Sequence, residues 1–318
     1  MYNPASGDQT RQAIVLKILK EKLCMHEIVC TYSTARFLND FSLSEVIADD
    51  RKAHGTAEDS IRAGMLLIDV DLVIVIGGDG TVCDVVLGQR MAGKTVPTAG
   101  VACGTANAGA LIAFNTAEDL RKHSFDKKMV VKPILGIDVY RGKQLVGVAF
   151  NDVVFSDCVV STVDGTTQMV KAREFLSGKK IPASPASIGT VESKIVINDR
   201  IVTPDFNIGQ IIISPIHNPE VHRAKALSGK LCWLPYTNMR GAMVVTDRPV
   251  IKMTTSKDLD PSVPLLMSQF IFGEQDVIRV YGTKGFSIVD GNPRINMEEE
   301  NSECVIKLNP RAALKYGF

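Results

Sequence analysis

The sequence has 318 residues, 45% of them hydrophobic, so it is long enough to form two domains with substantial cores. Its 36 lysine and arginine residues balance 35 acidic residues, so bulk charge indicates neither nucleic acid nor a membrane surface as a partner. The seven cysteines include no Cys-x-x-Cys pair, and no apolar run approaches the roughly 20 residues of a membrane span. We expect a cytoplasmic protein with reduced thiols.

The amino-terminal residues 1–8 are rich in turn formers. A turn of this kind usually follows the first strand of a parallel sheet, so we expect either a sheet that lacks one strand or a further strand before Met1. Helical spacing of apolar residues predicts an amphipathic helix over residues 10–24. A strand over residues 26–32 and a helix over 57–68 are expected next.

The stretch over residues 71–81 organises the rest of the chain. Its apolar run predicts a fully buried parallel strand that leads into a tight loop, Gly77-Gly78-Asp79-Gly80-Thr81. Glycines let the backbone approach a phosphate and present amide N–H groups to it. An acid beside a polyphosphate is unfavourable unless it abstracts a proton, holds a cation or hydrogen-bonds a hydroxyl, so Asp79 favours phosphoryl transfer over phosphate storage. A glycine-rich β-turn that contains an aspartate is the alternative.

The segment that follows repeats this arrangement. We expect a helix over residues 82–91, a strand over 96–102, and then a second loop of small residues, 103–109, with a helix that continues through Ile112. Two such corners in succession predict an open α/β sheet with ligands beyond the carboxyl ends of its strands. Polar side chains in the second loop either bind a ligand or cap the helix.

Beyond residue 123 the sequence is typical of β structure. Two long runs, 129–140 and 144–155, are joined by a turn over 141–143. Further strands are expected at 194–197, 208–214, 242–246, 250–254, 277–281, 286–289 and 305–308, with one helix over 167–176. We therefore predict an α/β domain with an open, mostly parallel, Rossmann-like sheet over 1–127. A β-rich, sandwich-like domain follows over 128–318, and its carboxyl-terminal tail could return to the first domain.

Several common motifs are absent from the sequence. There is no Gly-x-x-x-x-Gly-Lys-Ser/Thr loop and no Gly-x-Gly-x-x-Gly fingerprint. His217 and His222 have no nearby cysteine or acid that would complete a metal site, so no metal-binding residues are predicted. No Gly-x-Ser-x-Gly frame indicates a serine hydrolase.

Five motifs together resemble the superfamily that joins NAD kinases with diacylglycerol and sphingoid-base kinases. They are, in chain order, Asn3-Pro4-Ala5-Ser6-Gly7, Gly77-Gly78-Asp79-Gly80-Thr81, Cys103-Gly104-Thr105-Ala106-Asn107, Ala149-Phe150-Asn151-Asp152-Val153-Val154 and Val289-Asp290-Gly291. Within the superfamily, Ala186-Ser187-Ile188-Gly189 and Val289-Asp290-Gly291-Asn292-Pro293-Arg294 are similar to segments of the ATP-NAD-kinase-like group that includes the acetoin-catabolism X protein.

The resemblance implies a role for each of these motifs. Asp79 would be the catalytic residue that acts on the acceptor hydroxyl. The nucleotide phosphates would be bound by Asn3, Gly77, Gly78, Gly80, Thr81, Gly104, Thr105 and Asn107. The acceptor would be bound by Asn151 and Asp152, and ATP and Mg²⁺ would be the cofactors.

Our first hypothesis is an ATP-dependent transferase of the NAD-kinase type, active in NADP biosynthesis. It would phosphorylate the 2′-hydroxyl of the adenosine ribose of NAD, or a related nucleotide, in a crevice between the two domains. We expect the protein to bind a small-molecule substrate and to form a homo-oligomer. We expect neither nucleic acid nor a membrane as a partner. The alternatives are a lipid kinase, whose Gly-Thr-x-Asn loop the Gly104–Asn107 segment matches more closely, and a non-catalytic nucleotide-sensing protein.

Overall fold

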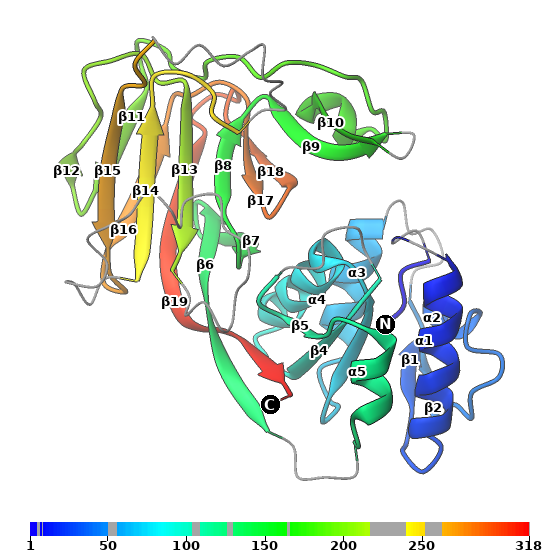
Figure 1. Ribbon diagram of the computed structural model, residues 1–318. Helices are drawn as coiled ribbons and strands as arrows, with labels where there is room; N and C mark the ends of the chain where they lie inside the picture. The colour runs from blue at the N-terminus through cyan, green and yellow to red at the C-terminus, as the bar shows by residue number, and fades with distance from the viewer. Residues whose placement is uncertain are drawn as a thin grey trace. The chain divides into compact units, whose positions relative to one another are not determined.

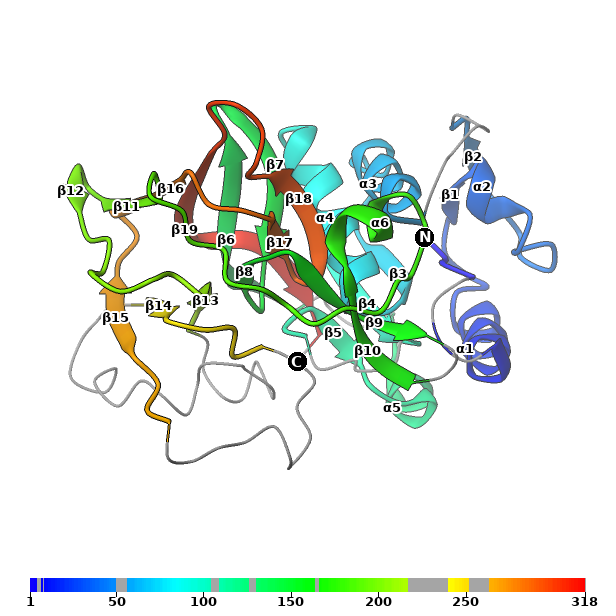
Figure 2. The same ribbon diagram turned by 90° about the horizontal axis from the view of Figure 1, so that it is seen from above.

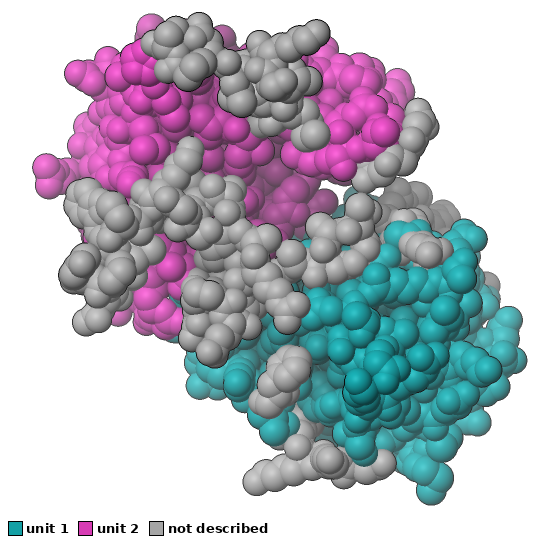
Figure 3. All heavy atoms as spheres, viewed as in Figure 1, with its two compact units in different colours: residues 1–135, 218–224, 310–318 teal, residues 136–217, 225–309 magenta. Residues whose placement is uncertain are grey.

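The computed structural model describes most of the chain as two compact units, which Figure 3 colours separately. The described residues are 1–4, 7, 9–49, 56–103, 109–125, 130–163, 166–216, 240–251 and 263–317. Among them, unit 1 contains the residues up to Leu135 and from Pro310 onward, and unit 2 contains the others. The predicted fold class is confirmed, because unit 1 is an α/β unit with parallel strands and unit 2 is β-rich.

Parallel strands form the centre of unit 1 (Figure 1). β3 (Val73–Gly77) pairs with β4 (Pro97–Ala102), which also pairs with β5 (Ile112–Phe114) and with the end of β19 (Glu303–Tyr316). β3 is apolar along its length and largely buried, as expected for a strand covered on both faces. On the edge of β3 away from β4, residues 1–3 run parallel to it, with a bridge between Tyr2 and Ile76.

Helices cover this sheet and fix its core. They are α1 (Gln9–Lys22), α3 (Thr56–Leu66), α4 (Asp79–Met91) and α5 (Ala117–Lys122), and α1 contacts α5. A short helix α2 (Tyr32–Ala35) accompanies a separate parallel pair, β1 (Val29–Thr31) and β2 (Glu45–Ile47). Val15 and Leu19 of α1 pack in one core cluster with Ile76 and Val101 of the sheet, so the apolar face of α1 covers the parallel strands.

Two glycines let α3 and α4 pack with their backbones in close approach. A Cβ atom at Gly64 of α3 would lie 2.0 Å from the carbonyl oxygen of Val85, and one at Gly88 of α4 would lie 1.9 Å from that of Ile61. Neither position accepts a side chain without moving a helix, because the obstructing atoms belong to the backbone. This contact holds the helix that begins at Asp79 against its neighbour.

Unit 2 is built from antiparallel strands (Figures 1 and 2). One sheet has six strands in the order β15 (Met267–Phe272), β14 (Gly241–Thr246), β13 (Gln210–Pro215), β8 (Val153–Ser156), β17 (Phe286–Val289) and β18 (Asn292–Asn296). The others are β6 (Val131–Arg141), β7 (Gln144–Ala149), β9 (Cys158–Val163), β10 (Thr166–Lys171), β11 (Lys194–Ile197), β12 (Arg200–Ile201) and β16 (Val277–Tyr281). The short helix α6 (Ala172–Leu176) packs beside the β9–β10 hairpin.

Most predicted strands of this region are present, including the hairpin of β6 and β7, where Gly142 has the positive φ of 59° that such a turn uses. The structure corrects four expectations. The segment that leads through Ile112 to Phe114 is a strand, β5, because it pairs with β4. Only 172–176 of the helix expected over 167–176 is helical, since 166–171 pair with β9. The run 144–155 is interrupted at 150–152. Val250 and Ile251 are not in a strand, because the backbone N–H groups of both residues donate to Oε1 of Gln210.

Candidate functional site

The candidate site is centred on the corner between β3 and α4. β3 ends at Gly77, and α4 begins at Asp79 with Gly78 as its N-cap in an extended conformation, φ −95° and ψ 179°. The helix therefore starts three residues earlier than predicted, and Gly80 and Thr81 lie in its first turn. None of the three glycines has a positive φ. The backbone N–H groups of Gly78 and Gly80 belong to a helix N-terminus, which is suited to binding a phosphate.

Asp79 is held by the segment that precedes β5. Its Oδ1 accepts a hydrogen bond from the backbone N–H of Gly109 at 3.0 Å. A Cβ atom at position 109 would lie 2.5 Å from the same oxygen, so this approach requires glycine. The carboxylate also lies in the first turn of α4, where the helix dipole stabilises a negative charge. The structure thus fixes an acid among backbone donors that could bind an anion.

Asn3 lies at the same corner. Its Nδ2 donates to Oγ1 of Thr81 at 2.8 Å, and both residues are buried, with 8% and 7% of their surface exposed. The backbone N–H of Asn3 donates to the carbonyl of Ile76 at 3.0 Å, and Gln12 donates to the carbonyl of Asn3 at 3.3 Å. Asn3, Gly77 at the end of β3, and the first turn of α4 with its N-cap Gly78 are therefore adjacent parts of the predicted phosphate site.

The second predicted loop is only partly described. Its first residue, Cys103, donates its backbone N–H to the carbonyl of Gly77 at 2.9 Å, which brings the start of the loop to the corner. Gly104, Thr105 and Asn107 lie outside the described residues. Their roles in binding phosphate stay predictions.

The predicted acceptor residues Asn151 and Asp152 lie in a turn of unit 2 that one carboxylate braces. β8 pairs with β17 through Val153 and Val289, which places the next residue, Asp290, beside the turn. Its Oδ2 accepts the backbone N–H of Phe150 at 2.8 Å, and its Oδ1 accepts those of Asn151 at 2.8 Å and Asp152 at 3.0 Å. The N–H of Asp290 in turn donates to the carbonyl of Asp152 at 3.0 Å. This aspartate therefore fixes the turn.

A second contact holds the backbone of this turn. Oγ of the buried Ser214 on β13 donates to the carbonyl oxygen of Asn151 at 2.6 Å. The side-chain Oδ1 of Asn151 is buried and has no hydrogen-bond partner among the described residues. A buried acceptor without a donor is costly, so this oxygen is suited to a donor such as a ligand hydroxyl.

No group of three or more histidine, cysteine, aspartate or glutamate side chains within the described ranges is placed to hold a metal ion. Mg²⁺ therefore stays a prediction, as an ion that would arrive with the phosphates of ATP. In the same described ranges, no helix is both long and apolar enough to cross a bilayer.

Three residues of these sites were missed by sequence reasoning. In the sequence, Gly109 is only a member of a small-residue loop, and Ser214 is only the end of a predicted strand. The motif that contains Asp290 indicates no role for this residue. Asp290 and Gly291 have φ values of 45° and 85°, so the Asp-Gly pair between two β runs was a recognisable hairpin signal. No local pattern shows that the carboxylate reaches back to residue 150.

Comparison with known proteins shows a family likeness in the amino-terminal part of the chain. Residues 1–123 match the family model described as the diacylglycerol kinase catalytic domain. The amino-terminal part of the chain is therefore similar to diacylglycerol kinase catalytic domains. This likeness supports a phosphotransferase and does not determine the acceptor. The likeness of the chain to the acetoin-catabolism X group, its cytoplasmic location and its oligomeric state stay predictions.

Individual relatives and solved structures are only distantly similar to this chain. An uncharacterized protein of Archaeoglobus fulgidus is 24% identical over 306 residues, which cover 92% of this chain and 90% of that protein. A solved structure described as a diacylglycerol kinase of Bacillus anthracis has a TM-score of 0.53 at 16% identity, covering 100% of this chain and 95% of that one. Yeast NADH kinase complexed with NADH has a TM-score of 0.51 at 14% identity, covering 100% and 81%. These two structures show a shared fold.

Proposed function

We propose that this protein transfers the terminal phosphoryl group of ATP to the 2′-hydroxyl of the adenosine ribose of NAD, or of a related nucleotide. The observation that carries the proposal is the placement of Asp79, whose carboxylate is fixed by Gly109 in the first turn of α4. A carboxylate held among backbone donors for phosphate is suited to accept the proton of an attacking hydroxyl. The likeness to the fold of yeast NADH kinase supports a nucleotide acceptor.

In this proposal the other residues bind and orient the substrates. The backbone N–H groups of Gly78, Gly80 and Thr81 bind the phosphates, and Asn3 orients the Thr81 hydroxyl. Mg²⁺ bound to the ATP phosphates neutralises the charge that Asp79 meets. Gly77 leaves space for the side chain of Thr81, because a Cβ atom at position 77 would lie 2.9 Å from the Cβ atom of Thr81.

The acceptor contacts complete the proposal. Asn151 and Asp152 bind the dinucleotide through an amide and a carboxylate, a pair that reads both donors and acceptors of a ribose or an adenine edge. The buried Oδ1 of Asn151 supports this role, since it has no donor among the described residues. Gly104, Thr105 and Asn107 are proposed to contact the nucleotide phosphates from the second loop.

The test is direct phosphoryl transfer. Purified protein is incubated with ATP, Mg²⁺ and NAD, and NADP is measured by chromatography, with calorimetric titration of ATP as a control for binding. We expect NADP to form only when ATP and Mg²⁺ are present. Binding of ATP without formation of NADP would show that NAD is not the acceptor, and binding without turnover of any acceptor would favour a sensing protein.

The name of the matching family favours a second candidate, a lipid kinase. The same preparation is assayed with diacylglycerol and with a sphingoid base in mixed detergent micelles, using labelled ATP. Transfer of the label to lipid, with none to NAD, would establish the lipid kinase and reject the first proposal. Assays of the same preparation with each acceptor therefore distinguish the two candidate functions.

A further inference from the structure

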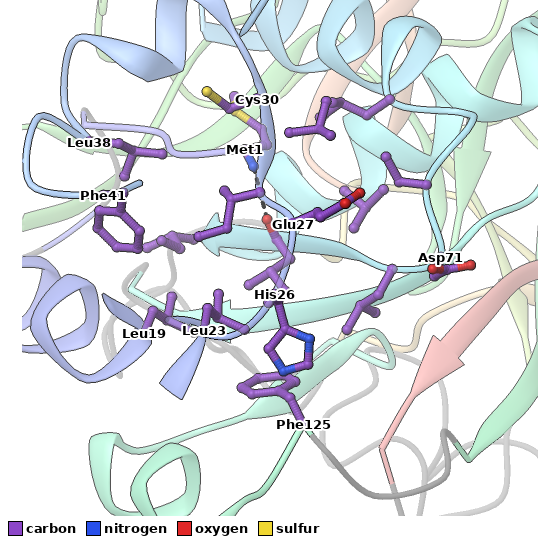
Figure 4. A pocket seen from close by; sticks show the side chains of 18 of the residues that line it. Met1, Leu19, Leu23, His26, Glu27, Cys30, Leu38, Phe41, Asp71 and Phe125 are labelled. Atoms are coloured by element: carbon purple, nitrogen blue, oxygen red, sulfur yellow. Dashed lines mark hydrogen bonds between the residues drawn. The ribbon is translucent and has the colours of Figure 1, made fainter. Parts of the chain in front are cut away.

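Pockets in the two units differ in their lining. One of about 660 Å³ lies in unit 1 and is closed largely by apolar side chains, such as those of Leu19, Leu23 and Phe41 (Figure 4). Another, of about 1140 Å³, lies in unit 2 and is lined mostly by charged and polar side chains. The polar lining indicates that the pocket of unit 2 suits a charged ligand.

The lining of this second pocket comes from residues within 190–194, 281–284 and 297–303, and we refer to it as the acidic pocket. Segment 281–284 leads into β17 at one end, whereas Asp290 follows β17 at the other. A strand of four residues spans about 13 Å. The acidic pocket is therefore separate from the turn that Asp290 braces.

Hydrogen bonds tie the three segments of the acidic pocket together. The hydroxyl groups of Thr190 and Ser193 both donate to the carbonyl of Gly282, at 2.6 and 3.0 Å. The backbone N–H of Met297 donates to the carbonyl of Gly285 at 2.8 Å. The backbone around the pocket is therefore fixed before any ligand binds.

Carboxylates dominate the lining. Five glutamates and two lysines leave three negative charges in excess; they are Glu192, Glu298, Glu299, Glu300 and Glu303, with Lys194 and Lys284. Three of the glutamates pair with arginines that do not line the pocket and whose side chains are between 34% and 61% exposed. Exposed pairs of this kind contribute little, so these carboxylates can also meet a ligand. Glu192 and Glu300 form no ion pair with another described residue.

The acidic pocket also contains a buried hydroxyl group. Thr283 lines the pocket with 2% of its surface exposed, and its Oγ1 has no hydrogen-bond partner among the described residues. A buried polar group without a hydrogen bond is costly, so a ligand that donates to this oxygen is favoured. The pocket thus offers exposed carboxylates together with one buried hydroxyl acceptor.

We propose that the acidic pocket binds a linear polyamine, a chain of ammonium groups joined by methylenes. An ammonium group only donates hydrogen bonds, so it matches both the carboxylates and the Thr283 hydroxyl. The methylenes would contact the exposed side chain of Val191. A metal ion fits less well, because no group of three acidic side chains in the described ranges is placed to hold one. The inference does not depend on the proposed function.

The experiment titrates the purified protein with spermine by calorimetry at low salt, and we expect saturable binding. Thr283→Val keeps the size of the side chain and removes the hydroxyl, so the dissociation constant should rise at least about tenfold. Thr283→Ser keeps the hydroxyl and should bind as the unchanged protein does. Because the hydroxyl has no partner among the described residues, Thr283→Val should not lower the melting temperature.

Charge is tested separately. Glu192→Gln and Glu300→Gln should each weaken spermine binding several-fold, and the exposed Glu21→Gln in α1 is the matched control.

Three results would overturn the proposal. Equal affinity of Thr283→Val and the unchanged protein would show non-specific attraction of a cation by the carboxylates. Tighter binding of an acetylated and amidated tetralysine peptide than of spermine would show a peptide site. A lower melting temperature of Thr283→Val would show that the hydroxyl is bonded within the protein.

Discussion

Two aspartates of this protein accept backbone N–H groups at turns next to strands, and their settings differ. Asp290 follows a strand, has a φ of 45°, and uses both carboxylate oxygens to hold three consecutive N–H groups. Asp79 begins a helix, and the described residues show its Oδ1 accepting the N–H of Gly109. A carboxylate surrounded by three donors stabilises its turn, whereas one placed at a helix N-terminus beside glycines lies where a phosphate could bind. The contrast indicates a structural role for Asp290 and agrees with the proposed role of Asp79 in turnover.

Replacement of Asp79 tests this assignment with the largest expected effect. Asp79→Asn keeps an oxygen for the N–H of Gly109 but cannot accept a proton. We expect kcat with the true acceptor to fall by at least about 100-fold. The melting temperature should change little. The exposed Asp69→Asn is the matched control, and an Asp79→Asn enzyme with full activity would contradict the role of Asp79.

Replacement of Asp290 should have the opposite result, a loss of stability in place of a direct loss of turnover. Asp290→Asn puts an amide group, itself a donor, against the donors of residues 150–152. Loss of these charge-assisted bonds should lower the free energy of unfolding by about 3 kcal/mol, measured by urea denaturation. The exposed Asp205→Asn serves as a control. If Asp290→Asn abolished turnover at unchanged stability, the contrast between the two aspartates would be wrong.

A methyl group at Gly109 tests the coupling of the second loop to Asp79. Gly109→Ala brings a Cβ atom to 2.5 Å from the Asp79 oxygen, so the carboxylate must turn away. We expect activity to fall roughly tenfold. In the Asp79→Asn background the same change should cost no further activity, because it acts through that carboxylate. Additive losses would indicate another cause.

The smallest effect is expected for the pair of Asn3 and Thr81. A double-mutant cycle with Asn3→Ala and Thr81→Val should give a coupling free energy of about 1 kcal/mol, as for a buried hydrogen bond between neutral groups. Unfolding in urea provides the measurement. A coupling near zero would show that the 2.8 Å contact contributes nothing to the corner.

Sequence reasoning succeeded where the signal was local. The uninterrupted apolar run of β3 and the glycine turn between β6 and β7 identify their elements directly. The start of α4 was misplaced, because Gly78 and Gly80 are poor helix formers and only the packed helix shows that Asp79 opens it. The partners of Asp290 lie 138 to 140 residues away, so only the folded sheet brings them together. The placement of β5 likewise depends on pairing with β4.

The close approach of α3 and α4 has a consequence for the position of Asp79. Gly88 lies nine residues after Asp79 on the same helix, so the contact and the carboxylate are about 13.5 Å apart along the axis. The helix between them behaves as a rigid rod, and a tilt of about 5° at Gly88 would move Asp79 by about 1 Å. Shifts of that size can cost about 100-fold in rate. A single methyl group at a site remote from any substrate could therefore misalign the reaction without unfolding the protein.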